Sequence, residues 1–346
     1  MRFLILAAVW LSMLIPIKEN PSFELDQSVQ VDTIFKGNFG CRALALDGNR
    51  LWFAATGSRY GFIDLDKNIS SENKLEPDTL DLRSIAITKN SVFLLNAGSP
   101  AFLFEVGKDG KQKAQRHSDS NKKTFYDSMK FWNDREGIAI GDPVENCLSI
   151  LITRDSGKNW HKIDCSLLPK INNGEAAFAS SNTNISIHGN NAWVVSGGSH
   201  SRIFHTSDKG KTWKVFDTPI VKGERMTGIF TSDFYDSKTG FVAGGDYSKP
   251  TSNVNNKAMT LDGGKTWKVM AQDKPFGYAS CIQYVPGSMG KKLWSVGATG
   301  LFYSEDSGET WKLMLNDYTL YTLVVKDQTT LFAAGKNKIV KITLKP

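Results

Sequence analysis

The stretch Thr206-Ser-Asp208-Lys-Gly210-Lys-Thr-Trp213 decides the fold, because its pattern occurs four times in this chain of 346 residues. The pattern is S/T-x-D-x-G-x-x-W, and the other copies are Thr153–Trp160, Thr260–Trp267 and Ser304–Trp311. An Asp side chain accepts hydrogen bonds from the amides of a turn, and Gly allows the positive φ that a tight hairpin needs. Each copy therefore predicts a hairpin whose Trp ring packs against the flanking strands.

A second, looser pattern gives the number of repeats. Short runs of β-forming residues end in Gly, which is typical of strands in crowded positions. Seven such runs occur, at residues 51–57, 92–98, 137–141, 192–197, 240–244, 293–297 and 331–335. The Asp residues of the four hairpins are 53, 54 and 44 residues apart, which is the length of a four-stranded propeller blade. The sequence therefore predicts an all-β, seven-bladed β-propeller of four-stranded antiparallel blades.

The two ends of the chain are predicted to close the ring. The last repeat ends at residues 338–344 without a fourth strand, and residues 29–35 precede the first repeat. Pairing these segments in one blade would remove exposed sheet edges. The long tract at residues 168–184 and the Ser- and Asn-rich stretch at 247–256 are predicted to be inserted loops on one face.

The N-terminus has the features of an export signal. Arg2 is followed by an apolar run from Phe3 to Ile15, which is shorter than a membrane span. We expect residues 1–22 to be a signal peptide, with an uncleaved anchor as the alternative, and residues 23–346 to be a single propeller domain. The mature protein would then be periplasmic or extracellular.

Composition and cysteine positions narrow the range of partners, cofactors and disulfides to be expected. The formal net charge is +7, but the Lys residues are scattered, so no nucleic-acid partner is expected. The sequence has no dinucleotide, haem or metal motif, so no cofactor or metal is expected, and we expect a monomer. Export would permit disulfides, and Cys147 and Cys165 flank the first hairpin almost symmetrically. We predict that these two are bonded and that Cys41 and Cys281 are free thiols.

The repeats resemble a known group of proteins. The hairpin pattern is similar to the Asp box of the bacterial neuraminidase repeat, and the propeller period resembles the photosystem II stability/assembly factor-like family. Residues 125–129, 141–143, 174–179 and 225–228 are similar to a version of that family in non-photosynthetic bacteria. The resemblance spans nearly the whole chain after the signal and implies binding of a partner protein, without identifying the partner. Because the Asp-box residues would lie on outer hairpins, we expect them to be structural: Asp155, Trp160, Asp208, Trp213, Asp262, Trp267, Asp306 and Trp311.

Polar residues near the starts of the innermost strands mark a candidate site. These starts would gather around one mouth of the central channel. The residues are Arg42, Arg83, Asp127, Glu175, Arg225, Tyr278 and Tyr321. Several Arg side chains together favour carboxylate or phosphate groups through bidentate hydrogen bonds. We therefore predict a mouth that binds a partner protein or an anionic or sugar ligand, with the two carboxylates orienting the Arg side chains.

The main alternative is a glycoside hydrolase of the sialidase or xyloglucanase type, with Asp127 and Glu175 as its catalytic pair. Propeller sialidases combine an Arg triad with a Tyr–Glu pair and an Asp. They also have six blades and an early Arg-Ile-Pro motif, for which Arg202-Ile203-Phe204 is the nearest counterpart, in the wrong blade. The sequence therefore favours a binding scaffold. The plainest alternative is a solvated network of charged side chains with no ligand.

Overall fold

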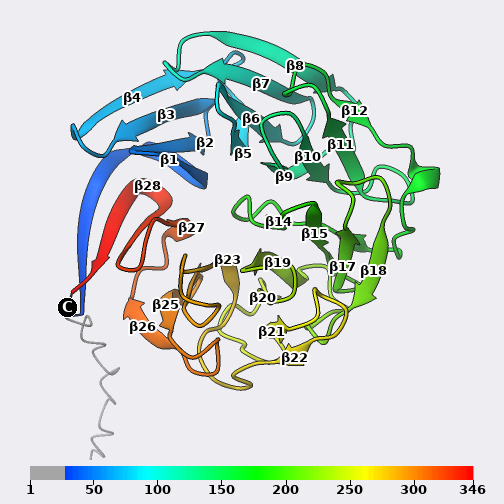
Figure 1. Cartoon of the computed structure of the whole chain (residues 1–346), viewed down its shortest axis with the longest axis vertical. Helices are drawn as coiled ribbons and strands as arrows, with labels where there is room; N and C mark the ends of the chain where they lie inside the picture. The colour runs from blue at the N-terminus through cyan, green and yellow to red at the C-terminus, as the bar shows by residue number, and fades with distance from the viewer. Residues whose placement is uncertain (1–27, 346) are drawn as a thin grey trace, which may run out of the picture.

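The computed structural model describes residues 28–345, and nearly all of the regular structure is β-strand (Figure 1). The strands form six sheets arranged around a common centre. This arrangement confirms the all-β propeller that the repeats predict. The proposed signal peptide lies outside the described residues. Within residues 28–345, no helix is long and apolar enough to cross a membrane.

Both ends of the described chain lie in one six-stranded sheet, with the order β27-β28-β1-β2-β3-β4. Its strands are β1 (Val29–Asp47), β2 (Arg50–Ala55), β3 (Arg59–Asp64), β4 (Ile69–Lys74), β27 (Leu320–Val325) and β28 (Thr330–Leu344). The start of β1 pairs with the end of β28 in antiparallel register, from Val29 opposite Leu344 to Lys36 opposite Lys338. The predicted pairing of the two ends is therefore present.

The prediction of seven separate blades is wrong, because the described strands form six sheets. The reason lies in two long strands. β1 has 19 residues and runs through both the closing segment and the innermost strand of the first repeat. β28 has 15 residues and contains the Leu331–Gly335 run that was expected in a separate blade. These strands join the first and last repeats into one hydrogen-bonded sheet, which repeat spacing alone does not reveal.

The other five sheets follow around the ring. The first two contain β5 (Asp81–Ile87), β6 (Ser91–Ala97), β7 (Ala101–Gly107) and β8 (Lys113–Asp119), then β9 (Tyr126–Phe131), β10 (Gly137–Gly141), β11 (Ser149–Thr153) and β12 (His161–Lys162). The third contains β14 (Ile185–His188), β15 (Asn191–Val195), β17 (Arg202–Thr206) and β18 (Lys214–Asp217). A 3-10 helix, η1 (Cys165–Leu167), precedes it in the chain.

The remaining two sheets complete the ring. One has six strands in the order β13-β16-β19-β20-β21-β22. They are β13 (Glu175–Ala176), β16 (Gly197–Gly198), β19 (Thr227–Phe234), β20 (Gly240–Asp246), β21 (Lys257–Thr260) and β22 (Lys268–Val269). The other contains β23 (Ala279–Tyr284), β24 (Leu293–Gly297), β25 (Gly300–Ser304) and β26 (Lys312–Leu315).

Each hairpin of the repeated pattern is held by its own side chains. In the second copy, Asp208 Oδ1 accepts hydrogen bonds from the amides of Lys211 and Thr212, at 3.0 and 2.9 Å. Gly210 N donates to the Thr206 hydroxyl at 2.8 Å. Partial burial opposes ionisation of Asp208, but hydrogen bonds from the hydroxyls of Thr212 and Thr206 and from the amides of Thr212 and Lys211 outweigh it and lower the pKa to about 2. The pattern therefore specifies a turn that needs no other part of the molecule.

The Gly of each hairpin packs against the preceding sheet. A Cβ at Gly308 would lie 2.3 Å from the Phe241 ring of β20, and one at Gly157 would lie 2.3 Å from the Phe93 ring of β6. The core between sheets combines aliphatic and aromatic side chains, and Trp52, which is fully buried, is among the largest. The hairpins therefore join adjacent sheets at the periphery and leave the centre to other residues.

Candidate functional site

The residues that face the centre are displaced by β-bulges. Six innermost strands, β1, β5, β9, β19, β23 and β27, each shift register where they pair with the next strand of their repeat, five of them near their start and β1 in its second half. A bulge leaves one residue outside the ladder and redirects its side chain. The residues left outside are Arg42, Arg83, Asp127, Phe230, Ser280 and Tyr321. Four of these were predicted from the sequence.

The predicted mouth is a cavity of about 570 Å³. Five of the seven predicted residues line it: Arg42, Arg83, Glu175, Arg225 and Tyr278. The two others lie next to the lining: the Arg42 guanidinium lies 4.3 Å from the centre of the Tyr321 ring, and Asp127 is close enough to Arg83 to feel its charge. The structure thus brings all seven residues into one neighbourhood.

The backbone of residues 178–184, here called the central segment, occupies the middle of the ring. The sequence predicted residues 168–184 to be a loop on one face, but the second half of this tract lies at the centre instead. Residues 179–184 are all buried. Asn182 accepts a hydrogen bond from Met129 N of β9 at 3.1 Å and donates to Ile85 O of β5 at 2.8 Å. Its φ of 60° is one that Asn adopts more readily than most residues.

Hydroxyl groups attach the central segment to the opposite side of the ring. The Thr183 and Thr231 hydroxyls are 2.7 Å apart, and Ser180 Oγ donates to Phe230 O at 3.1 Å. The Thr322 hydroxyl of β27 donates to Ser181 O at 3.2 Å. With the Asn182 contacts, these bonds join the segment to strands of four sheets. The segment therefore forms an internal floor beneath the cavity.

Two Arg side chains are anchored on this floor. Arg42 Nη1 donates to Ser180 O at 3.0 Å, and Arg83 Nη1 donates to Ala179 O at 3.2 Å. Arg83 Nε also pairs with Asp81 Oδ2 at 2.7 Å. A guanidinium group has five N–H donors, so these contacts fix each side chain and leave further donors for a ligand. The cavity therefore contains pre-oriented cationic groups.

Glu175 is a fully paired carboxylate. Arg202 donates to both of its oxygens, at 2.9 and 2.6 Å, Ser196 Oγ donates at 2.6 Å, and Asn172 N donates at 2.9 Å. Burial acts to raise the pKa of Glu175, but the bonds from Arg202, Asn172 and Ser196 outweigh it and lower the pKa. Glu175 therefore orients Arg202 and holds the cavity wall, and it does not orient the three predicted Arg residues.

Asp127 lies behind the cavity lining. Its side chain is fully buried, and neither carboxyl oxygen has a hydrogen-bond partner among the described residues. Burial raises the pKa of Asp127, nearby Asp142 raises it further, and Arg83 lowers it in part. Asp142 was missed by sequence reasoning. It lines the cavity, and its Oδ1 accepts a hydrogen bond from Ala177 N at 3.0 Å. The sequence feature that could have indicated Asp142 is its position just after Gly141, the end of a Gly-ending run.

The Asp127 and Glu175 geometry also bears on the hydrolase alternative. Six sheets remove the difference in blade number that argued against a sialidase. However, Glu175 is held by Arg202, Ser196 and Asn172, and Asp127 does not line the cavity. A two-carboxylate glycosidase needs both groups beside the bond that it breaks. The geometry of this pair therefore favours binding over hydrolysis.

The remaining wall of the cavity is largely aromatic. The Phe178 and Phe230 rings are stacked with centroids 4.0 Å apart, and Tyr278 packs edge-on against Phe230 at 4.8 Å and against Tyr247 at 5.2 Å. Burial raises the pKa of Tyr278, so its hydroxyl stays neutral. The sequence did not single out Phe230, although it precedes its Gly-ending run by about the same distance as Asp127. Arg225 is exposed at the rim.

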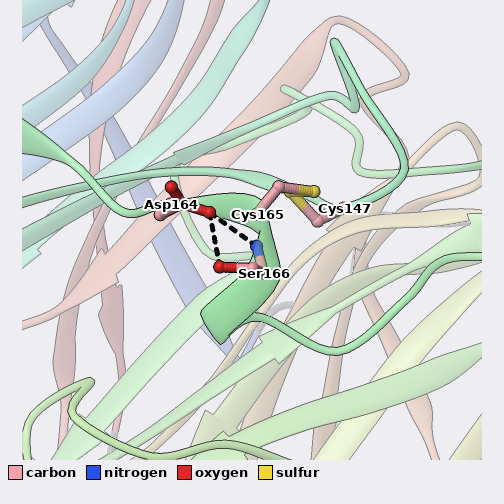
Figure 2. The surroundings of a disulfide bond; sticks show 4 residues. All are labelled: Cys147, Asp164, Cys165 and Ser166. Carbon is pink, nitrogen blue, oxygen red and sulfur yellow. Dashed lines mark hydrogen bonds between the residues drawn. A yellow bond between two sulfur atoms is a disulfide. The ribbon is translucent and has the colours of Figure 1, made fainter.

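The disulfide joins the outer edge to the tract that leads into the centre. Cys147 and Cys165 are bonded, with their Cα atoms 5.7 Å apart (Figure 2). Asp164 accepts a hydrogen bond from Ser166 N at 2.8 Å at the start of η1, beside the bond. Cys41 and Cys281 are free and buried. In the chain, the bonded pair comes just before the residues that form the cavity wall and floor.

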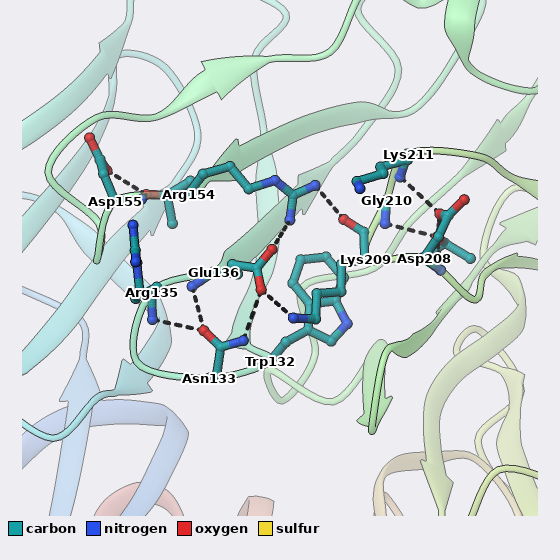
Figure 3. Close-up of polar contacts among 12 residues, drawn as sticks. Trp132, Asn133, Arg135, Glu136, Arg154, Asp155, Asp208, Lys209, Gly210 and Lys211 are labelled. Atoms are coloured by element: carbon teal, nitrogen blue, oxygen red, sulfur yellow. Dashed lines mark hydrogen bonds and ion pairs between the residues drawn. The ribbon is translucent and has the colours of Figure 1, made fainter.

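A second cavity of about 570 Å³ lies elsewhere and is lined by residues 133–136 and Arg154 (Figure 3). Its central carboxylate, Glu136, pairs with Arg154 at 3.1 Å and with Lys209 of the next repeat. Asn133 donates to Glu136 at 2.9 Å. Because the Glu136 charge is neutralised locally and the pairs bridge two repeats, we assign this cluster a structural role.

Comparison with known proteins supports the fold. No family model and no curated protein matches the chain. Among solved structures, YCF48 bound to D1 peptide aligns with a TM-score of 0.65 at 14% identity, over 92% of this chain and 97% of that chain. YCF48 from Cyanidioschyzon merolae aligns with a TM-score of 0.65 at 12% identity, over 90% and 98%. The RRP9 WD40 repeats align with a TM-score of 0.64 at 9% identity, over 91% and 97%.

At these sequence identities, the similarity shows that the chain shares the propeller fold of these structures. The chain is therefore similar in fold to the YCF48 propellers and to the RRP9 WD40 propeller alike.

Proposed function

We propose that the protein is a partner-binding scaffold that captures an acidic segment of another protein in the cavity. The observation that carries this proposal is the convergence of Arg42, Arg83 and Arg225 on one cavity of about 570 Å³. Guanidinium groups bind carboxylates through paired, charge-assisted hydrogen bonds. The YCF48 structure with a D1 peptide supports a protein partner, because that propeller has the same fold and binds a peptide.

The aromatic wall supports a peptide over a small inorganic anion. Phe178, Phe230 and Tyr278 provide apolar surface opposite the Arg donors. Ligand sites usually combine such surface with a few oriented polar groups. A peptide with an acidic residue beside an apolar one would use both kinds of contact.

We also propose that the protein is exported, to a periplasm or to the medium. The apolar run after Arg2 supports this, and so does the Cys147–Cys165 disulfide, because such bonds persist in oxidising compartments. N-terminal sequencing of the mature protein from fractionated cells tests it. Recovery of the intact chain in the cytoplasmic fraction would contradict export.

Binding to two matched probes tests the cavity. We expect fluorescent tetraglutamate to bind and tetraglutamine not to bind. Arg42→Ala combined with Arg83→Ala should weaken tetraglutamate binding roughly a hundredfold, because each charge-assisted hydrogen bond contributes about 1.5–3 kcal/mol. The matched control is Arg59→Ala combined with Arg116→Ala, which removes two Arg side chains that pair with Glu72 and Glu105 away from the cavity. This control should bind like the wild type.

The same variants test the protein partner. The wild type should capture specific exported proteins, and the Arg42/Arg83 double variant should lose them while keeping the wild-type melting temperature. Equal tetraglutamate binding by both proteins would contradict the proposal. Turnover of a glycoside that disappears in Glu175→Gln would instead support the hydrolase.

A further inference from the structure

Two carboxyl groups lie together at the cavity, one fully buried behind its lining and one partly buried in the lining. Asp127 follows Tyr126 in β9, Asp142 follows Gly141 of β10, and Tyr126 and Gly141 are paired across the two strands. Asp127 is fully buried and has no hydrogen-bond partner on either oxygen among the described residues. Asp142 lines the cavity. An unpartnered carboxylate is costly to bury, and two neighbouring carboxylates cannot both ionise easily.

We infer that Asp127 and Asp142 form a proton-binding site that couples anion capture in the cavity to pH. The inference rests on the proposed anion binding and adds its regulation. When the pair holds a proton, its charge no longer opposes an anion that approaches Arg42 and Arg83. When the pair is fully ionised, it repels the anion and attracts the Arg83 guanidinium. Anion capture and proton uptake therefore favour each other, as linkage requires.

The charges around the pair support this direction. Arg83 of β5 is the cation that acts on Asp127. Glu175, on the cavity wall, is neutralised by Arg202. Its negative charge therefore does not repel an anion in the cavity as the ionised Asp pair would. Ala177, just before the central segment, donates its N–H to Asp142 Oδ1, whether Asp142 is ionised or protonated. Burial raises the pKa of Asp142 to about 6, and burial and Asp142 raise that of Asp127.

The first test measures tetraglutamate affinity at about pH 5.5 and about pH 8. Wild-type affinity should fall at least about fivefold at the higher pH, the low end of ordinary coupling between sites. Asp127→Asn and Asp142→Asn each replace an ionisable group with a neutral one of the same shape. Each should bind with similar affinity at both pH values and more tightly than the wild type at about pH 8.

Glu224→Gln is the matched control, because Glu224 is an exposed carboxylate next to Arg225 at the rim. This variant should keep the wild-type pH dependence. Testing both Asp variants keeps the inference falsifiable if one of them fails to fold. An unchanged pH dependence in the folded Asp variants would overturn it.

The second test needs no ligand. A carboxyl whose pKa is raised in the folded protein keeps its proton while the unfolded chain loses it, so this contribution to stability declines as pH rises from 3.8 to about 6. Urea unfolding should show that Asp142→Asn gains stability over the wild type as pH rises through this range. No gain would overturn the proton site.

The two tests separate this inference from the proposed function. If tetraglutamate does not bind but the stability difference follows pH, the partner proposal fails and the proton site stands as a structural feature. If tetraglutamate binds equally at both pH values, the partner proposal stands and the coupling fails.

Discussion

The outer hairpins and the centre of the ring are built in opposite ways. In each hairpin, residues within a few positions of one another make the essential bonds, as Asp208 does with Lys211 and Thr212. At the centre, bonds join residues far apart in the chain, as Asn182 does with Ile85 and Met129. Hairpin residues therefore serve stability, whereas central residues position the side chains that would bind a partner. Substitutions in the two regions should have different consequences.

The largest expected effect is a loss of stability at the periphery. Gly308→Ala places a Cβ 2.3 Å from the Phe241 ring, at a φ of 86°. Overpacking costs about 1–3 kcal/mol and a left-handed conformation about 1–2 kcal/mol, so we expect a loss of about 4 kcal/mol. Urea unfolding measures this loss, and the affinity for tetraglutamate should stay unchanged in the folded fraction.

Gly48→Ala separates the two contributions. Gly48 also has a positive φ, of 57°, but a Cβ there would have no neighbour within 4 Å. Only the backbone cost of about 1–2 kcal/mol should remain. Similar losses at Gly48 and Gly308 would show that the hairpin does not pack tightly against the preceding sheet.

The disulfide tests the same comparison, because it links the outer edge to the tract that leads into the centre of the ring. Cys147 and Cys165 are 18 residues apart, and a loop of this length predicts a stabilisation of about 3 kcal/mol. We expect Cys147→Ser combined with Cys165→Ser to lower the free energy of unfolding by this amount. The cavity should keep its affinity, because the following tract is also attached through buried Leu168 and through Arg202, which donates to Lys170 O. A large loss of affinity would show that the tract depends on the bond.

The contrast also explains what sequence could predict. The hairpins were predictable because the bonding residues of each copy lie within eight consecutive positions, and the pattern repeats. The positions of Arg42, Arg83, Asp127 and Tyr321 were predictable because each strand places its bulge near the same point. A periodic signal of this kind requires no knowledge of contacts between repeats.

Other features depended on contacts that no local pattern records. The first and last repeats share one sheet because β1 runs without a break from the part that pairs with β28 into the first repeat. The floor was missed because residues 178–184 have no periodicity, and their partners lie in other repeats. The role of Glu175 was misjudged because Arg202, 27 residues later, pairs with it. Each error concerns a bond between distant residues.

A modest loss of stability, with a marked effect on binding, is expected at Asn182. Asn182→Gly preserves the positive φ of 60° but removes the amide that bonds Ile85 O and Met129 N. Leaving buried polar groups unpaired costs about 1–3 kcal/mol, so we expect a loss of about 2 kcal/mol in urea unfolding.

Affinity should respond more strongly than stability, because the central segment provides the carbonyl groups that hold Arg42 and Arg83. If Asn182→Gly lets the floor move, both guanidinium groups lose their orientation, and tetraglutamate binding should weaken about tenfold or more. Gly308→Ala provides the comparison, since it should lose more stability and no affinity. If Asn182→Gly and Gly308→Ala instead lower affinity only in proportion to unfolding, central residues serve stability just as hairpin residues do.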